Sequence, residues 1–383
     1  MLMKPSLIFV ATTPFAVNAF LRNHLITLSK SYEITLCVNT IAYPLSEEVL
    51  DLVSVCHIDI ARQISPVKDL VALFQLLFCF RKLRPTIIHS VTPKAGLLAM
   101  IAGYILKVPL RFHTFTGQVW ANKKGSIRFL LKTMDKLIAF CATRVFADSA
   151  SQSCFLENQG VVRRGKISIL GKGSLAGVDL KRFRPNPIFR KSLRAELELS
   201  DESLVFLFVG RIVRDKGIYD LLEAFVLISQ THADWQLWIV GPDEGHIKTA
   251  LETSKFSSIG RVYWFGETSK PELYMAAADV LVLPSYREGF GSVIIEAAAC
   301  GIPCVAYRID GVVDAIISGK TGLLVEVADI RSLANSMQLM GNQKDKREKL
   351  GKAAYSRAVK NFSSSSISKS WEKFYEDTLR KNM

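Results

Sequence analysis

Short apolar segments alternate with longer amphipathic segments along the chain. In the first half, the apolar segments predict strands at residues 7–11, 33–39 and 86–90, and the amphipathic segments predict helices at 15–30, 67–84 and 94–106. Strands separated by helices form βαβ units, whose strands lie parallel in one sheet.

The same alternation restarts after the proline-containing segment 183–187, with predicted strands at 204–209, 236–240, 261–265, 280–283 and 303–306. Near the end, Trp371, Phe374 and Tyr375 follow helical spacing and predict a closing helix. We therefore predict an α/β protein with two Rossmann-like, doubly wound domains that face each other across a cleft. The predicted boundaries are 1–185 and 186–361, with a C-terminal helix at 362–383 that packs back on the first domain.

The net charge of +14 comes entirely from the first half. Residues 1–185 hold 24 Lys and Arg against 10 Asp and Glu, whereas residues 186–383 hold 25 of each. A basic half needs an anionic partner, which leaves nucleic acid, an anionic membrane face or a phosphorylated substrate.

The seven cysteines are scattered, without a CxxC pair or a histidine at metal-ligand spacing. They indicate buried thiols in a reducing compartment instead of a disulfide framework or a zinc site. The first apolar segment is too short for a signal peptide, and the most apolar stretch, 70–80, is shorter than the roughly 20 residues that a spanning helix needs. We expect a cytoplasmic protein.

The clearest chemical signal lies at residues 287–296, between the strand at 280–283 and a helix that starts near Ser292. Gly289 and Gly291 allow tight backbone turns, and their N–H groups together with a helix N-terminus suit an anion or a polar sugar. Glu288 precedes these glycines, and Glu296 shares a helical face with Ser292. Taken alone, the segment also fits a simple helix cap with a solvated glutamate.

Three further strand ends in the same domain carry glycines or cations. Arg211 and Lys216 follow the first strand, at the edge where α/β sheets bind ligands, and fixed cations there would stabilise a departing diphosphate. The alternative for these two residues is ordinary surface charge. The other strand ends carry the pairs Gly241-Pro242 and Phe265-Gly266. Together they favour a ligand site over separate accidents.

With Glu288 and Glu296 in an E-x7-E pattern, Gly210-Arg211 and Lys216-Gly217 before it, and Gly177 and Asp179 at the hinge, the chain resembles the retaining glycosyltransferases of family 4, which have the GT-B fold. The resemblance implies a nucleotide-sugar site in the second domain and an acceptor site in the first. It implies that Arg211 and Lys216 hold the donor diphosphate, that Glu288 binds the sugar hydroxyls and that Glu296 binds the ribose. The donor-binding residues expected in addition are Gly210, Gly241, Pro242, Phe265, Gly266, Gly289, Phe290, Gly291 and Ser292.

On the acceptor side, the resemblance places His113 beside the transferred sugar, and the alternative is a core histidine bonded to backbone. His113, Arg211, Lys216 and Glu288 form the expected catalytic group. Many relatives have a glycine-rich turn after the first strand, but this chain has no glycine before Gly96, so acceptor contacts there must come from Thr12 and Thr13 or from looser backbone. This variant loop resembles the branch that elongates polyprenyl-diphosphate-linked sugars in bacterial envelope polysaccharide assembly.

The expected reaction is retaining transfer of a hexose or N-acetylhexosamine from a nucleotide sugar, with UDP favoured, to a lipid-linked saccharide in O-antigen, capsule or glycan assembly. A soluble or lipopolysaccharide-core acceptor is the alternative. No Asp-x-Asp triplet occurs, so we expect a metal-independent enzyme without a cofactor.

Basic and large apolar residues mix at 81–84 and 123–136, and we expect peripheral attachment to the cytoplasmic face of the inner membrane. For either segment alone, a buried amphipathic helix with a solvated basic face fits equally well. A nucleic-acid-binding protein is disfavoured because no zinc module, recognition helix or RNP-type strand is apparent, and we expect no nucleic-acid partner. A Rossmann oxidoreductase is disfavoured because neither half opens with G-x-G-x-x-G.

Overall fold

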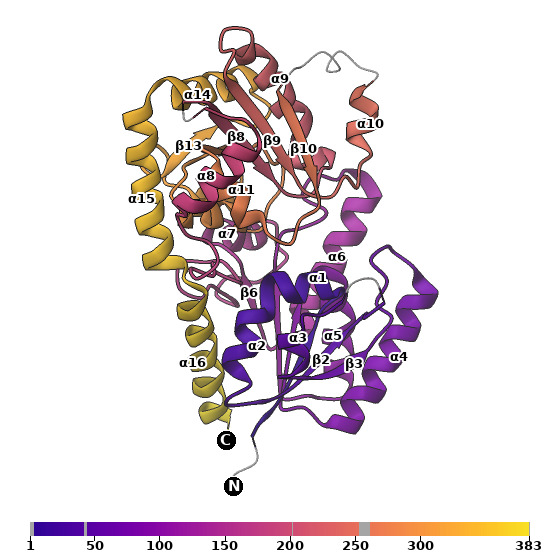
Figure 1. The fold of residues 1–383 in the computed structure, drawn as a ribbon. Coiled ribbons are helices and arrows are strands. Elements are labelled where there is room, and N and C mark those ends of the chain that lie inside the picture. Colours follow the sequence, from indigo (N-terminus) through magenta and orange to yellow (C-terminus); the bar gives the residue numbers. More distant parts are fainter. Residues whose placement is uncertain (1–3, 42–43, 201, 253–260, 383) are drawn as a thin grey trace. The chain divides into compact units, whose positions relative to one another are not determined.

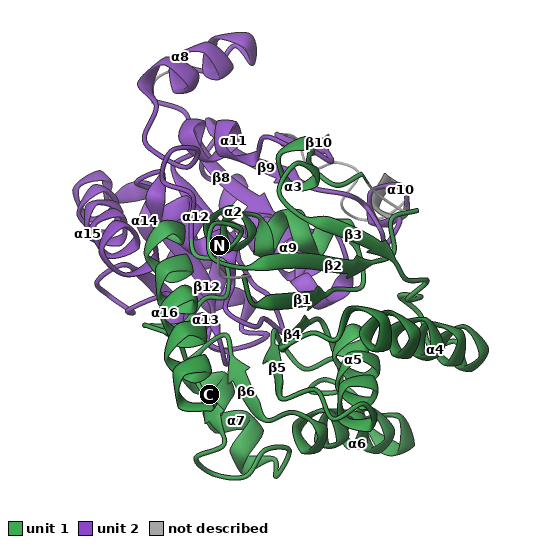
Figure 2. Ribbon diagram, turned by 90° about the horizontal axis from the view of Figure 1, so that it is seen from below, with its two compact units in different colours: residues 1–177, 364–383 green, residues 178–363 purple. Residues whose placement is uncertain are grey.

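A computed structural model of the chain describes residues 4–41, 44–200, 202–252 and 261–382. The chain divides into two compact units, 1–177 with 364–383, and 178–363 (Figure 2). The boundary lies earlier than the predicted 185/186, because the hinge segment folds with the second unit. There the Val178 N–H donates to the Phe362 carbonyl at 2.7 Å, and the Phe183 side chain is buried in the second core.

The first unit is a seven-stranded parallel sheet with strand order β3-β2-β1-β4-β5-β6-β7 (Figure 1). Its elements are β1 (Ser6–Val10), α1 (Pro14–Ala16), the π-helix η1 (Val17–Leu21), α2 (Arg22–Leu28), β2 (Glu33–Val38), α3 (Glu47–Leu50), β3 (Ser54–His57), α4 (Pro66–Leu83), β4 (Ile87–Val91), α5 (Pro93–Ile105), β5 (Leu110–Phe115), α6 (Gly125–Cys141), β6 (Arg144–Ala147), α7 (Ala150–Asn158), β7 (Ile167–Ser168) and α16 (Ser364–Asn382).

The second unit is a six-stranded parallel sheet with strand order β10-β9-β8-β11-β12-β13. Its elements are α8 (Pro187–Glu196), β8 (Leu204–Val209), the 3-10 helix η2 (Arg214–Lys216), α9 (Ile218–Ser229), β9 (Trp235–Val240), α10 (Ile247–Glu252), β10 (Val262–Gly266), α11 (Pro271–Ala277), β11 (Val280–Leu283), α12 (Ser292–Ala299), β12 (Cys304–Tyr307), α13 (Val312–Ala315), β13 (Gly322–Val325), α14 (Ile330–Asn342) and α15 (Lys344–Phe362).

Both sheets have the strand order of doubly wound α/β folds, in which the chain runs outward from a central strand first to one side and then to the other. Successive residues of β1 alternate between two hydrophobic clusters, with Ile8 and Val10 in one, and Leu7 and Phe9 in the other. The central strands are therefore buried on both faces, which explains why they read as continuous apolar runs in the sequence.

Two helix predictions also need correction. The single helix predicted at 15–30 is divided into α1, the π-helical turn η1 and α2, with Thr13 capping the first of these through its hydroxyl. The closing helix starts at Ser364 instead of residue 362, because Phe362 ends the preceding helix α15 and its ring is buried in the second core.

The last helix, α16, completes the core of the first unit. Trp371 and Tyr375 are buried there, and the Trp371 ring lies 4.8 Å from the ring of Phe146. The buried His89 ring contacts the Tyr375 hydroxyl through Nδ1 and the Thr114 hydroxyl through Nε2 at 2.8 Å. Burial lowers the pKa of His89 well below its usual value, so this histidine is a neutral hydrogen-bonding group.

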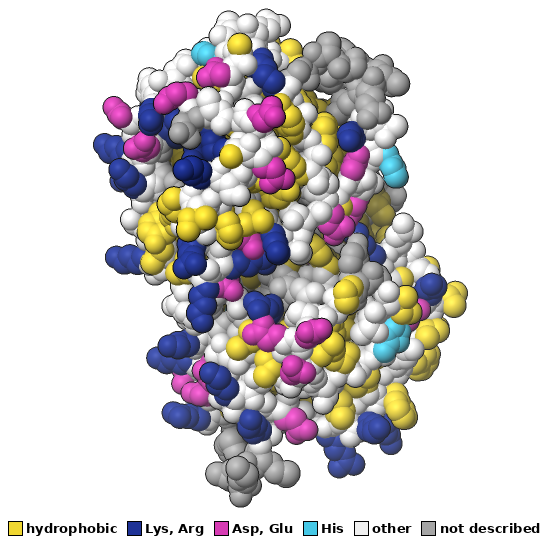
Figure 3. All heavy atoms as spheres, in the orientation of Figure 1, with side chains coloured by type: hydrophobic (Ala, Val, Ile, Leu, Met, Phe, Trp, Pro, Cys, Tyr) yellow, Lys and Arg dark blue, Asp and Glu magenta, His cyan; other side chains and the backbone are white. Residues whose placement is uncertain are grey.

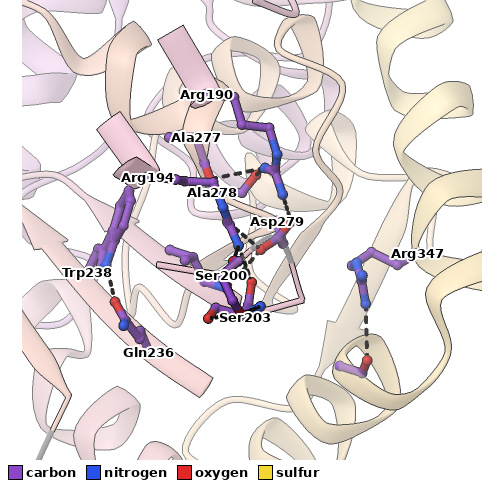
Figure 4. Close-up of polar contacts among 12 residues, drawn as sticks. Arg190, Arg194, Ser200, Ser203, Gln236, Trp238, Ala277, Ala278, Asp279 and Arg347 are labelled. Atoms are coloured by element: carbon purple, nitrogen blue, oxygen red, sulfur yellow. Dashed lines mark hydrogen bonds and ion pairs between the residues drawn. The ribbon is translucent and has the colours of Figure 1, made fainter. Parts of the chain in front are cut away.

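A cluster of polar contacts fixes α8 to the amino-terminal edge of the second sheet (Figure 4). The Asp279 carboxylate accepts from Arg190 at 2.7 Å and from the Val205 N–H at 2.8 Å, and the buried Arg194 lies 3.4 Å away. A cavity of about 300 Å3 adjoins this cluster. Both lie at the strand ends opposite the glycine turns at Gly210 and Gly241.

Replacement of Trp371 by alanine should lower the free energy of unfolding by about 3–5 kcal/mol, because it leaves a large cavity among buried rings. Urea denaturation followed by circular dichroism measures this change. Lys373→Ala, at an exposed position on the same helix, is the control. Equal denaturation midpoints for the two variants would contradict the packing of α16 into the first core.

Candidate active site

The second sheet has its topological switch point between β8 and β11, the position where doubly wound folds bind ligands beyond the carboxyl ends of the strands. The loop after β8 carries Arg211 and Lys216, and the loop after β11 carries Glu288. Two of these three predicted residues meet directly. Lys216 Nζ lies 2.5 Å from Glu288 Oε1, and both side chains are mostly buried.

Backbone contacts hold these two loops together. The Tyr286 N–H donates to the Asp215 carbonyl at 2.9 Å. Gly217 has a φ of +72°, and a Cβ added there would lie 1.9 Å from the Pro284 carbonyl oxygen. Only glycine fits such an approach, so the residue after Lys216 sets the distance between the loops.

The third predicted residue, Arg211, has a different partner. Its Nη1 lies 3.0 Å from Glu244 Oε2, on the loop after β9, and both side chains are partly exposed. These two loops also approach closely, because a Cβ at Gly241 would lie 1.9 Å from the Gly210 carbonyl oxygen. The Ile212 N–H donates to the Pro242 carbonyl at 2.8 Å. Arg211 and Lys216 therefore lie on one loop but pair with acids on opposite sides of it.

The glycine loop before α12 has the predicted backbone. Gly291 caps α12 with a φ of +76°, and the ring of Phe290 is buried against Phe362 at 5.2 Å. Because the Phe290 side chain belongs to the core, only its backbone can serve a ligand. A Cβ at Gly311 would lie 2.3 Å from the Gly289 carbonyl oxygen, so a second glycine, unassigned by sequence reasoning, supports this loop.

Of the two remaining predicted strand ends, the one at Phe265-Gly266 combines a packed aromatic ring with a glycine that has open space beside it. The Phe265 ring packs on Tyr274 at 4.8 Å and on Trp238 at 5.5 Å, which makes it part of the support for the strand end. Gly266 has a φ of +71° and open space where a Cβ would be. The Gly266 carbonyl accepts a hydrogen bond from the Gly241 N–H at 2.7 Å, which joins the two strand ends.

Glu296 lies on α12, one helical turn after Ser292. Burial raises the pKa of its carboxyl to about 7, with Arg182 lowering it and Glu272 raising it further. Arg182 and Glu272 form an ion pair of their own at 2.8 Å. The Glu296 carboxyl thus changes its charge near neutral pH, as groups at ligand sites often do.

Sequence reasoning missed a carboxylate that positions the loop after β11. Asp220, on α9, accepts hydrogen bonds from the Tyr286 and Tyr307 hydroxyls, both at 2.6 Å. Tyr286 comes two residues before Glu288, so this contact fixes the loop from behind. Neither tyrosine belongs to a glycine turn or a charged motif, which left no local signal for the role.

In the first unit the switch point lies between β1 and β4. Thr12, just after β1, is buried, and its hydroxyl lies 2.7 Å from that of Thr92, just before α5. The Thr13 hydroxyl accepts from the Ala16 N–H at 3.4 Å and so caps α1. Both threonines therefore fix the loop in place through their side chains.

His113 lies on β5 and is almost completely buried. Its Nδ1 lies 2.9 Å from the Ser90 hydroxyl, and that hydroxyl donates to the Phe112 carbonyl at 3.4 Å. Donation from the Ser90 hydroxyl to Phe112 would make Nδ1–H the donor to Ser90 and leave Nε2 as an acceptor. Burial lowers the pKa of His113 to about 3, so the ring is neutral at physiological pH.

Gly96 on α5, another residue missed at the sequence level, makes room for this ring. A Cβ there would lie 2.4 Å from His113 Cε1 and 2.6 Å from Nδ1. The first glycine of the chain therefore has a steric function, and any larger residue would displace the imidazole.

Two family profiles match the two halves of the chain. The profile described as glycosyl transferase 4-like domain matches residues 27–173, and the one described as glycosyl transferases group 1 matches residues 189–357. The second match contains every donor-site position described above.

Two relatives that match over most of their length support the same assignment. The capsular polysaccharide biosynthesis glycosyltransferase CapM of Staphylococcus aureus is 31% identical over 328 residues, which is 85% of each chain. The UDP-Gal:alpha-D-GlcNAc-diphosphoundecaprenol alpha-1,3-galactosyltransferase of Escherichia coli is 29% identical over 285 residues, which is 73% of this chain and 72% of that protein.

Among solved structures, Anabaena HepE in complex with UDP and glucose superposes with a TM-score of 0.78 at 20% identity, over 97% of this chain and 99% of that chain. This likeness shows a shared fold. With both family profiles and the two relatives, it establishes that the chain belongs to the family-4 glycosyltransferases, which have the GT-B fold.

Proposed function

We propose that the chain transfers a hexose or N-acetylhexosamine from a UDP-sugar to a polyprenyl-diphosphate-linked saccharide, with retention of anomeric configuration. The observation that carries the proposal is the contact of Lys216 with Glu288 at the switch point of the second sheet, beside the glycine-capped start of α12. A cation and an acceptor side by side suit the junction between a diphosphate and a sugar.

Lys216 can serve the protein and the donor at once. An ammonium group has three N–H donors, and Glu288 accepts one of them, so two can point to phosphate oxygens. The fixed ammonium then stabilises the negative charge that develops on the diphosphate as the glycosidic bond breaks. Arg211, held by Glu244, supplies a second cation on the same loop.

Glu288 accepts hydrogen bonds from the sugar hydroxyls, and Glu296 accepts them from the ribose. The diphosphate oxygen that leaves the sugar takes the proton of the acceptor hydroxyl on the same face, so retention needs no covalent intermediate on the protein. In the first unit, His113 stays neutral and its Nε2 accepts a hydrogen bond from the transferred sugar.

The donor and acceptor classes rest on relatives. The Escherichia coli relative is named for a UDP-sugar donor and a diphosphoundecaprenol acceptor, and the Staphylococcus aureus relative is named for capsule biosynthesis. A soluble or lipopolysaccharide-core acceptor is the second candidate. Transfer needs no metal in this proposal, because Arg211 and Lys216 provide the charge that a metal ion provides elsewhere.

A surface on the first unit fits the membrane where a polyprenyl acceptor resides. Five apolar side chains of α4 are strongly exposed, namely Val67, Leu70, Val71, Phe74 and Phe78. Figure 3 shows hydrophobic side chains beside Lys and Arg side chains over the region that Figure 1 labels α4. The helix α5 packs against both α4 and α6, and Phe129 and Phe140 of α6 are also exposed.

The charge of this surface matches an anionic lipid face. Arg81, Lys82 and Arg84 are exposed at the end of α4. On α6 the cations are partly engaged, since Arg128 and Lys132 lie 5.2 and 5.6 Å from the Trp120 ring. In the described part of the chain, no helix has the length and apolarity of a membrane span. We propose peripheral attachment through α4 and α6 to the cytoplasmic face of the membrane.

Replacing Lys216 by alanine should lower kcat/KM by about a hundredfold to a thousandfold, because the leaving diphosphate loses a fixed charge. Glu288→Gln should have a similar effect through the sugar hydroxyls. The assay is sugar transfer from a UDP-sugar to a polyprenyl-diphosphate-linked saccharide in excess chelator. Lys191→Ala, an exposed position on α8, is the control and should keep the wild-type rate.

The same assay separates the candidate functions. Transfer to a soluble saccharide at an equal rate would favour the second candidate acceptor. Loss of activity in chelator with recovery on addition of magnesium would refute metal independence. Wild-type rates in both Lys216→Ala and Glu288→Gln would refute the donor site itself.

Binding of the UDP-sugar should weaken about tenfold from pH 8 to pH 6. The pKa of Glu296 is about 7, so at pH 8 the carboxyl is ionised and accepts from the ribose hydroxyls, whereas at pH 6 about nine tenths of it is protonated. Isothermal titration calorimetry at the two pH values measures the dissociation constants. Glu296→Gln should remove the pH dependence, and its persistence in that variant would exclude Glu296 as the cause.

Introducing a charge on α4 by Phe78→Glu should weaken binding to vesicles of phosphatidylglycerol and phosphatidylethanolamine by tenfold or more. Phe78 is exposed in the protein and would be buried in the membrane. Removing one such side chain from the membrane costs about 1.5–3 kcal/mol, and about 1.4 kcal/mol corresponds to a tenfold change in the binding constant. Co-sedimentation at low salt measures the partitioning. Ile188→Glu, also strongly exposed but on the second unit, is the matched control, and equal binding by both variants would refute the α4 surface.

A further inference from the structure

Three of the seven cysteines, which are far apart in the sequence, meet in the first unit. Cys37 is on β2, Cys56 on β3 and Cys79 on α4. Cys37 and Cys56 are register partners on neighbouring parallel strands, so their side chains point to the same face of the sheet, where α4 packs. All three sulfur atoms lie within 4.8 Å of one another.

The spacing of the sulfurs suits shared coordination. Cys37 Sγ and Cys79 Sγ are 3.8 Å apart. Two thiolates on one tetrahedral zinc ion, with Zn–S bonds of about 2.3 Å, also lie roughly 3.8 Å apart. The third sulfur needs to move by roughly 1 Å or less to complete a three-thiolate set around the same point, given that zinc geometry.

The surroundings of the three sulfurs give an ion a path to the site and a positive charge nearby. Cys37 and Cys79 are buried among apolar side chains, whereas Cys56 is partly exposed on the edge strand β3, which gives an entry path. The positive charge of Lys82 lies close enough to Cys56 to offset part of the negative charge of a thiolate complex.

The helix that carries Cys79 is fixed to this edge of the sheet independently of the sulfurs. The Gln75 side chain accepts from the Asp59 N–H at 3.1 Å, just after β3. His57, the neighbour of Cys56, is occupied by the Thr40 hydroxyl at 2.9 Å. The protein thus preorganises three thiols, and in the described part of the chain no other Cys, His, Asp or Glu joins the group.

We propose that Cys37, Cys56 and Cys79 form a site for one thiophilic d10 metal ion, bound through three thiolates. Three sulfur ligands suit Cu+ in trigonal coordination, or Zn2+ with water in the fourth position. The site is separate from the donor site, lies within the first unit and does not depend on the proposed glycosyl transfer. Bound metal would link β2, the edge strand β3 and α4.

The test uses the full-length, fully reduced protein, titrated with Zn2+ against a chromophoric chelator and, without oxygen, with Cu+ against a competing Cu+ chelator. The wild type should bind one equivalent of at least one of the two ions, and X-ray absorption should show three sulfur ligands at about 2.2–2.3 Å. Cys56→Ser should weaken binding by about a hundredfold or more. Cys154→Ser, which removes an exposed thiol of α7 outside the cluster, should bind as the wild type does.

Further outcomes decide the matter. Bound metal should raise the melting temperature of the wild type and of Cys154→Ser, and it should leave Cys56→Ser unchanged. Circular dichroism of the metal-free variants shows whether each is folded, and Cys79→Ala serves if Cys56→Ser is not. No stoichiometric binding of either ion, equal binding by wild type and folded Cys56→Ser, or loss of binding in Cys154→Ser would overturn the proposal. A disulfide within the cluster that persists under reductant would overturn it as well.

Discussion

The candidate donor site depends on how closely the backbone after β8 approaches the backbone after β11. At Gly217 the two loops are so near that no side chain fits between them, and this proximity lets Lys216 reach Glu288. The contact pairs the cation of Lys216 with the carboxylate of Glu288 at the switch point, where the order of the strands reverses. Without it, neither side chain would have a fixed position, since Lys216 ends the short 3-10 helix η2 and Glu288 lies on a loop.

Much of the fold follows from the sequence because the central strands are buried on both faces. The strands at 204–209 and 280–283 were predicted with their observed bounds, since each is an uninterrupted apolar run between polar residues. Five strands were not predicted, namely β3, β5, β6, β7 and β13. Four of them have only two to four residues, and polar residues interrupt the apolar run in β5. The π-helical turn in the predicted helix at 15–30 has no marker in the sequence that we can identify.

The site was only partly predictable. Motif spacing together with the strand order suffices to bring Lys216 and Glu288 to the same edge of the sheet, but it cannot tell that Arg211 pairs with Glu244 on the other side. Residues that act from behind the loops, such as Asp220 and Gly96, have no motif of their own and become visible only through tertiary contacts. The cysteine cluster shows the same limit, since it depends on strand register and on the face of α4.

Because α16 belongs to the first unit, it limits the order in which the two units can fold. The ribosome completes residues 178–363 before it adds the helix that supplies Trp371 and Tyr375 to the first core. The first unit therefore cannot cover His89 and Phe146 with the Trp371 ring until residues 178–363 have been made, so its core closes only after the chain has returned to it.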